Sequence, residues 1–197
     1  MSAPSWLEIV GAGLGFVYVV LVIRQKVWCW PVGILSAVFY VLVFFQSRLY
    51  GQVGLQCVYI ALMAYGWREW GRGGASTESL VVSRLPRRWR TGVVLGGVAL
   101  SVAIGILLAS RTDAVLPFWD GGTTAWSLLA QWMTARKWIE NWAVWIAVNV
   151  VYVGMYASQH LYPTTLLYGA FLVLAVLGLR EWRRVLRRAS SPSPETA

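Results

Sequence analysis

Long apolar stretches separated by short charged loops dominate this chain of 197 residues. A helix needs roughly 20 apolar residues to cross the hydrocarbon core of a bilayer. We predict seven such helices, at 6–23, 30–46, 51–68, 92–110, 116–134, 142–159 and 162–179. Pro31 suits the first turn of the second helix, where a missing N–H breaks no hydrogen bond. The pattern is typical of an all-α membrane protein.

The composition agrees with this prediction. Hydrophobic residues make up 58% of the chain and charged residues only 13%, about half the usual charged fraction of a soluble protein, ~25%. The two cysteines are too few for a disulfide framework. No basic segment precedes the first apolar stretch, so we predict no cleavable signal peptide. The last residues, 189–197, are polar and proline-rich, and we expect them to be disordered.

The net charge of +9 is unevenly placed along the chain. If the N-terminus lies outside, fifteen of the seventeen basic residues fall on one membrane face and only Arg48 and Arg111 on the other. Basic loops favour the cytoplasmic side, so the N-terminus is predicted outside and the C-terminus inside. The basic runs therefore indicate topology and contact with lipid headgroups, and not binding of nucleic acid.

Two halves of the chain match at an offset of 112 residues. Without a gap, 28–72 and 140–184 share 15 identities in 45 pairs, including "REW" at 68–70 and 180–182. Four spans separate equivalent positions, so the halves have the same orientation, a parallel repeat known in transporters. We therefore expect a 3+1+3 architecture with the substrate site near the midplane. The first three-helix repeat is predicted at 1–72 and the second at 118–188. A basic inner loop with a linker helix lies between them at 73–117, and a tail follows at 189–197.

A ladder of rings and one amide runs along the sixth span. At about 100° per residue, its members share one stripe roughly 80° wide; they are Trp142, Trp145, Asn149, Tyr152 and Tyr156. An unpaired amide at mid-membrane costs several kcal/mol, so Asn149 must face a partner helix or a polar cavity. A hydrogen bond between helices would explain it, but the neighbouring rings favour a ligand cavity.

Further polar residues follow single helical faces on two other spans. The third span offers Gln52, Gln56, Tyr59 and Met63, and the fifth offers Thr124, Ser127, Gln131 and Thr134. The stripe of the second span that matches the ladder has Gly33 and Ala37 in place of Trp145 and Asn149, which predicts room for a flat ligand on that side. Amides, hydroxyls and rings suit a small, ring-containing, polyhydroxylated ligand, and aromatic faces would attract a cationic one.

Charged residues are predicted only near the ends of the spans. Because a proton relay needs ionisable groups inside the membrane, none is expected here. No metal-ligand cluster, phosphate-binding loop or catalytic triad is apparent, and we expect neither a cofactor nor enzymatic activity. His160, the single histidine, is interpreted as a solvated loop residue. Five tryptophans beside the basic loops are assigned to the lipid interface: Trp28, Trp67, Trp70, Trp138 and Trp182.

The chain resembles the PnuC family of bacterial vitamin transporters, whose best-known members take up nicotinamide riboside. The resemblance covers about 6–184 and rests on "LPFWDG", "YGW" at 65–67, and "ENW" with the W-x-x-W-x-x-x-N spacing of Trp142, Trp145 and Asn149. It implies a SWEET-like fold, a homotrimer in the bacterial inner membrane, and facilitated diffusion with trapping by a cytosolic riboside kinase. The motif residues inherit a substrate-binding role, while Gln56, Tyr59, Gln131 and Tyr152 are added on the arguments from helical faces.

Nicotinamide riboside is the first candidate substrate and thiamine is the second, with riboflavin as a further alternative; related members of the family are thought to carry thiamine or riboflavin. A non-transporting membrane receptor or assembly protein is the alternative of another class. It predicts no uptake and no need for the Asn149 amide.

Overall fold

Seven helices make up the computed structural model, which describes residues 6–46, 50–71, 80–112, 116–158, 160 and 162–189. They are α1 (Trp6–Ile23), α2 (Cys29–Gln46), α3 (Tyr50–Gly71), α4 (Arg87–Arg111), α5 (Pro117–Ala135), α6 (Asn141–Ser158) and α7 (Tyr162–Ala189). Each overlaps one of the seven helices predicted from the apolar stretches, but α7 continues well beyond the predicted end at 179 and α4 begins before the predicted start at 92, because charged residues extend both helices past the apolar stretch. Pro31 lies in the first turn of α2 and Pro117 begins α5, as expected where a proline removes no helical hydrogen bond.

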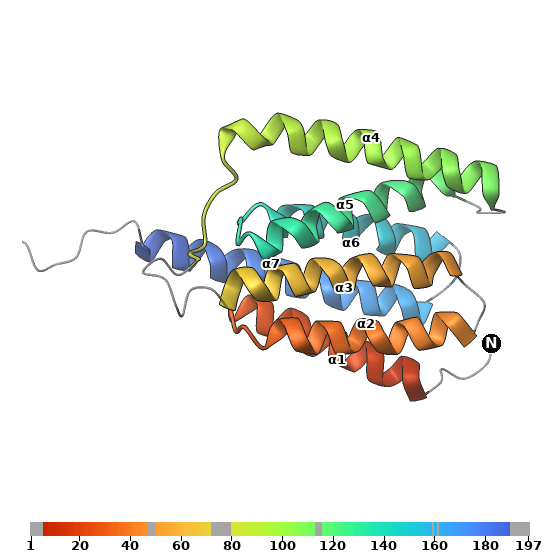
Figure 1. Cartoon of the computed structure of the whole chain (residues 1–197), viewed down its shortest axis with the longest axis horizontal. Helices are drawn as coiled ribbons and strands as arrows, with labels where there is room; N and C mark the ends of the chain where they lie inside the picture. The colour runs from red at the N-terminus through yellow and green to blue at the C-terminus, as the bar shows by residue number, and fades with distance from the viewer. Residues whose placement is uncertain are drawn as a thin grey trace, which may run out of the picture.

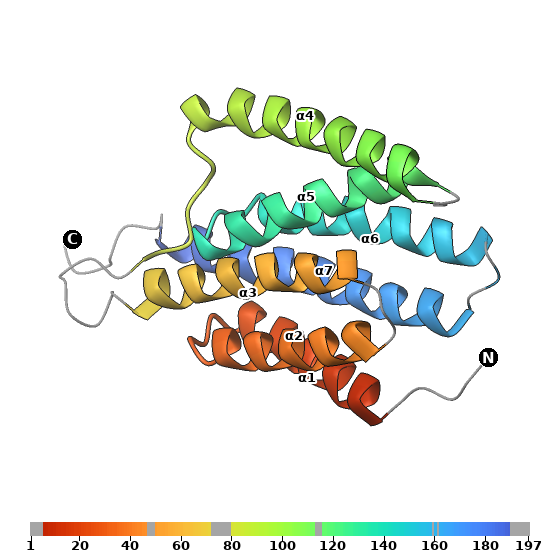
Figure 2. The ribbon, with the colours of Figure 1, turned by 45° about the vertical axis from the view of Figure 1, so that its right-hand side comes forward.

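Six of the helices form a closed ring, and the seventh lies outside it. The helices run up and down along the long axis of the molecule (Figures 1 and 2). Neighbours around the ring are α1, α2, α3, α5, α6 and α7, and α7 returns to α1. Within the described chain α4 packs against α5 alone. We refer to α1–α3 as the first triplet and α5–α7 as the second triplet.

Glycines bring α4 and α5 close together. A Cβ atom at Gly121 would lie 2.5 Å from the backbone nitrogen of Gly105, and one at Gly97 would lie 2.8 Å from the ring of Trp126. Small residues allow such close backbone approach between membrane helices. The position of α4 is therefore set by α5.

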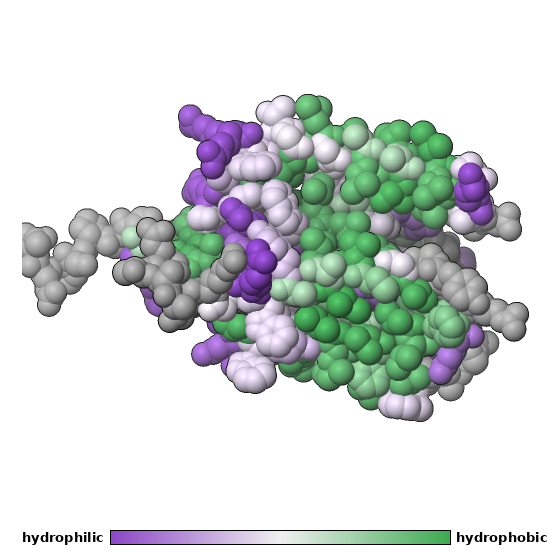
Figure 3. Space-filling model, viewed as in Figure 1, coloured by the Kyte–Doolittle hydropathy of each residue, from purple (hydrophilic) through white to green (hydrophobic). Residues whose placement is uncertain are grey.

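The surface is that of a membrane protein. Among the described residues, four helices are long and apolar enough to cross a bilayer: α1, α2, α4 and the 164–189 part of α7. The remaining three have lower hydropathy because they hold the amides, hydroxyls and tyrosines, many of which point inward. The face seen in Figure 3 is largely hydrophobic between its two ends, and hydrophilic residues gather towards those ends. The prediction that all seven helices span the membrane stays a prediction.

The turn inside each triplet follows the same path. Gln25, between α1 and α2, and Lys137, between α5 and α6, both have a positive φ, 54° and 51°. Backbone hydrogen bonds from residues 24, 25, 26, 29, 30 and 32 of the first turn recur, donor and acceptor alike, 112 residues later. Two chain segments of different sequence thus adopt one turn geometry.

Tryptophan packing recurs at the same offset. The Trp30 ring lies edge-on to Trp70 at 5.1 Å and 87°, and Trp142 lies edge-on to Trp182 at 5.4 Å and 88°. The rings of Trp30 and Trp142 fill the space left by Gly66 and Gly178, respectively. The indole N–H groups of Trp70 and Trp182 then reach across to the other triplet, donating to the carbonyls of Ala135 and Val22.

The assignment of five tryptophans to the lipid interface is wrong for three of them. Trp28 and Trp67 are exposed, as that assignment requires, but Trp70, Trp138 and Trp182 are buried. Trp70 and Trp182 lie in the packing between the triplets. Trp138 packs edge-on against Trp132 at 4.9 Å. A position beside a basic loop therefore does not indicate whether a tryptophan ring faces the lipid or the protein interior.

Candidate substrate-binding site

The face of α6 that carries the ring ladder points into the protein. Trp142 and Asn149 are buried, whereas Trp145, Tyr152 and Tyr156 are partly buried. The Asn149 amide nitrogen donates to the carbonyl of Trp145 at 2.8 Å, within its own helix. Because one N–H is used there, the rest of this amide can serve a neighbour or a ligand.

Three polar side chains of α5 face the same region. Ser127, Gln131 and Thr134 are all buried, although hydroxyls and amides are costly to bury unless they are hydrogen-bonded. Gln131 meets Tyr18 of α1: the tyrosine hydroxyl lies 3.1 Å from Oε1 and 2.8 Å from Nε2 of the glutamine. The Trp145 indole N–H approaches the Thr134 hydroxyl at 3.4 Å.

The antiparallel register of α5 and α6 sets Gln131 and Asn149 at one height. Thr134 lies beside Trp145, and Ser127 lies beside Tyr152. The residue numbers of the two pairs add up to the same value, as they do along two antiparallel helices. Interpolating between these pairs brings the Gln131 and Asn149 positions level with each other, about midway along α6 and in the last third of α5. Two buried amides thus come from adjacent helices to the interior of the ring.

A second group of hydroxyls gathers around Ser127. Tyr59 of α3 and Tyr152 of α6 both interact with its side chain, and Thr123, one turn earlier on α5, also meets Tyr152. Nevertheless Ser127 Oγ is fully buried without a hydrogen bond of good geometry in the described chain. Such a hydroxyl is positioned to bind a ligand or a water molecule.

Stacked tyrosines extend this group towards the end of the ring where α7 begins. The Tyr152 ring lies 5.8 Å from that of Tyr156 and 4.5 Å from that of Tyr168, and Tyr156 and Tyr168 stack at 5.2 Å. Tyr168 was missed by the sequence analysis. The repeat could have identified it, because Tyr168 stands 112 residues after Gln56, a candidate on the third span.

The predicted site residues are therefore brought together unequally. Tyr59, Gln131, Trp145, Asn149 and Tyr152 are all buried or partly buried, and Tyr59 and Tyr152 both approach Ser127. Gln56 is half-buried one turn before Tyr59 and makes no hydrogen bond to the others within the described residues.

The Trp142 ring is used mainly in packing between helices. Its ring lies against Gly178 and Trp182 near the α5–α6 turn. The indole N–H, however, is buried with no hydrogen-bond partner in the described chain. This donor is what remains for a ligand.

The room expected at Gly33 is already filled. A Cβ atom there would lie 2.6 Å from Met63 Sδ and 2.7 Å from the Tyr18 ring. The glycine makes space for the tyrosine that bonds Gln131, and not for a flat ligand. The prediction of an open side at this position is wrong because side chains of α1 and α3 occupy it.

The polar lining belongs mainly to the second triplet. At the offset of 112, Thr123, Ser127, Gln131 and Thr134 of α5 correspond to Gly11, Gly15, Val19 and Val22 of α1. The interior of the ring is thus chemically one-sided. It offers amides, hydroxyls and aromatic faces, a combination suited to a neutral or cationic ring with hydroxyl substituents.

Comparisons with known proteins agree with a membrane carrier. The model of the family described as "Nicotinamide mononucleotide transporter" matches residues 5–184. The chain is 27% identical to the nicotinamide riboside transporter PnuC of Escherichia coli (strain K12), over 95% of this chain and 89% of that one. The PnuC of Neisseria mucosa is 30% identical over 96% and 76%.

Two further similarities bear on fold and substrate. The riboflavin/roseoflavin transporter RibM of Streptomyces davaonensis is 28% identical over 98% of this chain and 91% of that one. A crystal structure of the vitamin B3 transporter PnuC superimposes with a TM-score of 0.74 at 27% identity, covering 93% of this chain and 83% of that one.

Proposed function

The chain belongs to the nicotinamide mononucleotide transporter family, and from this premise we propose that it imports nicotinamide riboside across the bacterial inner membrane. The names of its relatives from Escherichia coli and Neisseria mucosa support this substrate. The observation that carries the proposal is the buried group of amides, hydroxyls and rings enclosed by the helices.

The site residues divide the recognition of the substrate between them. Nicotinamide riboside combines a flat pyridinium cation with a ribose. The aromatic faces of Trp145, Tyr59 and Tyr152 hold the cationic ring, an attraction worth ~2 kcal/mol when desolvated. Gln131, Asn149 and Ser127 exchange hydrogen bonds with the carboxamide and the ribose hydroxyls. Trp142 and Gln56 flank this group.

The proposed architecture is the SWEET-like 3+1+3 arrangement, with α4 as the linker helix. The recurrence of turn geometry and ring contacts at the offset of 112 supports a pseudo-twofold axis along the membrane normal. Alternating access then follows from rocking of one triplet against the other around the site. The chain acts as a homotrimer, each protomer with its own site, with its N-terminus outside and its C-terminus in the cytoplasm.

Transport is facilitated diffusion followed by trapping. In the described chain, charged side chains lie near helix ends or in the connecting turns, where they cannot relay protons across the bilayer. Net uptake therefore depends on phosphorylation of the substrate by a cytosolic riboside kinase. No cofactor and no catalysis by this chain are required.

Riboflavin is the second candidate substrate. The RibM relative matches as closely as the nicotinamide riboside transporters do, and three contiguous tyrosine rings could stack on a larger flat ring system.

The test is titration of the purified protein with nicotinamide riboside, riboflavin and thiamine, followed by tryptophan fluorescence. Nicotinamide riboside should bind most tightly. Asn149→Ala should weaken its binding about tenfold, the loss expected when a ligand's buried hydrogen bond is removed. Val150→Ala, on the exposed side of α6, should leave binding unchanged. Tighter binding of riboflavin or thiamine would reassign the substrate, and no response to any of the three would contradict the transporter proposal.

A further inference from the structure

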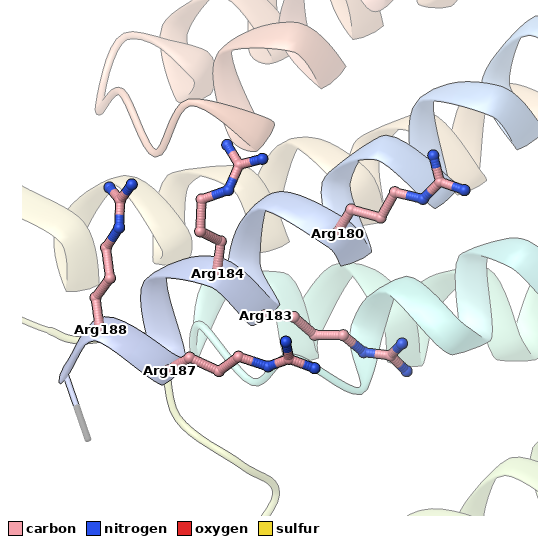
Figure 4. A pocket seen from close by; sticks show the side chains of 5 residues that line it. All are labelled: Arg180, Arg183, Arg184, Arg187 and Arg188. Carbon is pink, nitrogen blue, oxygen red and sulfur yellow. The ribbon is translucent and has the colours of Figure 1, made fainter. Parts of the chain in front are cut away.

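Five arginines occupy the last three turns of α7: Arg180, Arg183, Arg184, Arg187 and Arg188 (Figure 4). All are exposed. At 1.5 Å per residue the 28 residues of α7 extend for ~42 Å, whereas the hydrocarbon core of a bilayer is ~30 Å thick. The arginine-bearing turns therefore lie at the headgroup level or beyond it.

One apolar stripe of α7 leads directly into these arginines. Leu166, Val173 and Leu177 are all exposed, and the series continues at helical spacing through Arg180, Arg184 and Arg188. On an ideal helix these six residues lie within a stripe roughly 80° wide. In Figure 4 the side chains of Arg180, Arg184 and Arg188 extend to one side of the helix, whereas Arg183 and Arg187 extend to another.

The arginines leave a concave space between them. Its volume is about 420 Å³, and all of the residues that line it are arginines. Among the described residues, Glu181 accepts a hydrogen bond from Arg184 Nη1 at 2.8 Å. This pair is exposed, so it is worth little in water and cannot neutralise five guanidinium groups.

We propose that this end of α7 is a binding site for an anionic phospholipid. The guanidinium groups of Arg180 and Arg184 hold the phosphate, with Arg188 beyond them at the outer part of the headgroup. The acyl chains lie along Leu177 and Val173. A lipid satisfies both halves of the stripe at once, whereas a free phosphate would use only the arginines. The site is independent of the transported substrate and requires only that α7 crosses the membrane.

The experiment measures the thermal unfolding of the full chain in neutral detergent. The additives are dioleoylphosphatidylglycerol, dioleoylphosphatidylcholine or inorganic phosphate at matched ionic strength. Phosphatidylglycerol should raise the melting temperature, and the other two should not. Arg180→Gln with Arg184→Gln should weaken the apparent affinity for phosphatidylglycerol roughly thirtyfold, the loss expected for two arginines at an anionic surface. Arg183→Gln with Arg187→Gln removes equal charge from the same turns and should weaken it far less.

Three outcomes of the unfolding experiment would overturn the proposal. Equal stabilisation by phosphatidylcholine would show that the headgroup charge is irrelevant, and equal stabilisation by phosphate would show a free-anion site. Equal losses in the two double variants would reduce the effect to general surface charge. Native mass spectrometry of the unmodified protein with both lipids in equal amounts provides a readout without substitutions. It should retain phosphatidylglycerol, and retention of both lipids equally would also contradict the site.

Discussion

At the level of single residues, the two triplets differ in what surrounds two equivalent pairs of stacked rings. Tyr152 and Tyr156 stack at 5.8 Å, and their equivalents Tyr40 and Phe44 stack at 5.7 Å. The partners of these rings differ, however. Tyr40 packs against Gly11, whereas Tyr152 meets Thr123, the equivalent position, and Ser127. A shared ring geometry therefore has hydroxyl partners in the second triplet only.

This difference predicts unequal effects for one substitution made at equivalent positions. Tyr152→Phe removes a hydroxyl from the polar group around Ser127 and should weaken substrate binding about fivefold, as expected for a neutral hydrogen bond. Tyr40→Phe should leave binding unchanged. The measurement is the fluorescence titration with nicotinamide riboside. Equal effects at both positions would indicate a symmetric site.

Residue-level sequence reasoning succeeded where a side chain's helical face decided its surroundings. Gln131, Asn149 and Tyr152 were predicted to face inward from the spacing of polar residues, and they do. It failed where the outcome depended on a neighbouring helix. Only the packed structure reveals that Tyr18 fills the space at Gly33, or that Trp182 turns inward to the Val22 carbonyl.

At the level of helices, one glycine in each triplet determines how closely its helices pack. Gly66 on α3 and Gly178 on α7 let the rings of Trp30 and Trp142 lie directly against the helix backbone. A Cβ atom would come within 2.3 Å and 2.5 Å of these rings. Fused rings packed edge-on against further tryptophans have little freedom to withdraw.

Gly66→Ala and Gly178→Ala should therefore each destabilise the protein by ~1–3 kcal/mol, the usual range for overpacking a core. Gly154→Ala and Gly169→Ala are matched controls on α6 and α7, since nothing lies within 4 Å of a Cβ atom at either position. They should be neutral or slightly stabilising, because alanine favours the helix. Thermal unfolding in detergent measures all four. Tolerance of alanine at both packed glycines would mean that the tryptophans move freely.

Helix positions were largely predictable because apolar length alone sets a membrane helix. Charged or polar turns marked the ends of the apolar stretches, and each helix falls on its predicted stretch. The arrangement around the ring was not predictable in this way. Several helices expose apolar side chains, so hydropathy does not identify their neighbours. Close contacts at Gly105 and Gly121 do so for α4 and α5.

At the level of the whole molecule, the placement of charge predicts how transport is driven. Proteoliposomes containing the protein should equilibrate nicotinamide riboside at zero membrane potential without accumulating it. Neither a proton gradient nor a sodium gradient should change the final level, because no charged relay is available within the described chain. Enclosing a riboside kinase with ATP should convert equilibration into accumulation. Uphill uptake driven by an ion gradient alone would contradict facilitated diffusion.

The location of α4 outside the ring decides which triplet it would follow during transport. Residues 83 and 137–139 are joined by backbone hydrogen bonds, and α4 is seated on α5 by its glycines. Residues 80–112 are therefore attached to the second triplet. If one triplet tilts against the other, α4 therefore moves together with the second triplet.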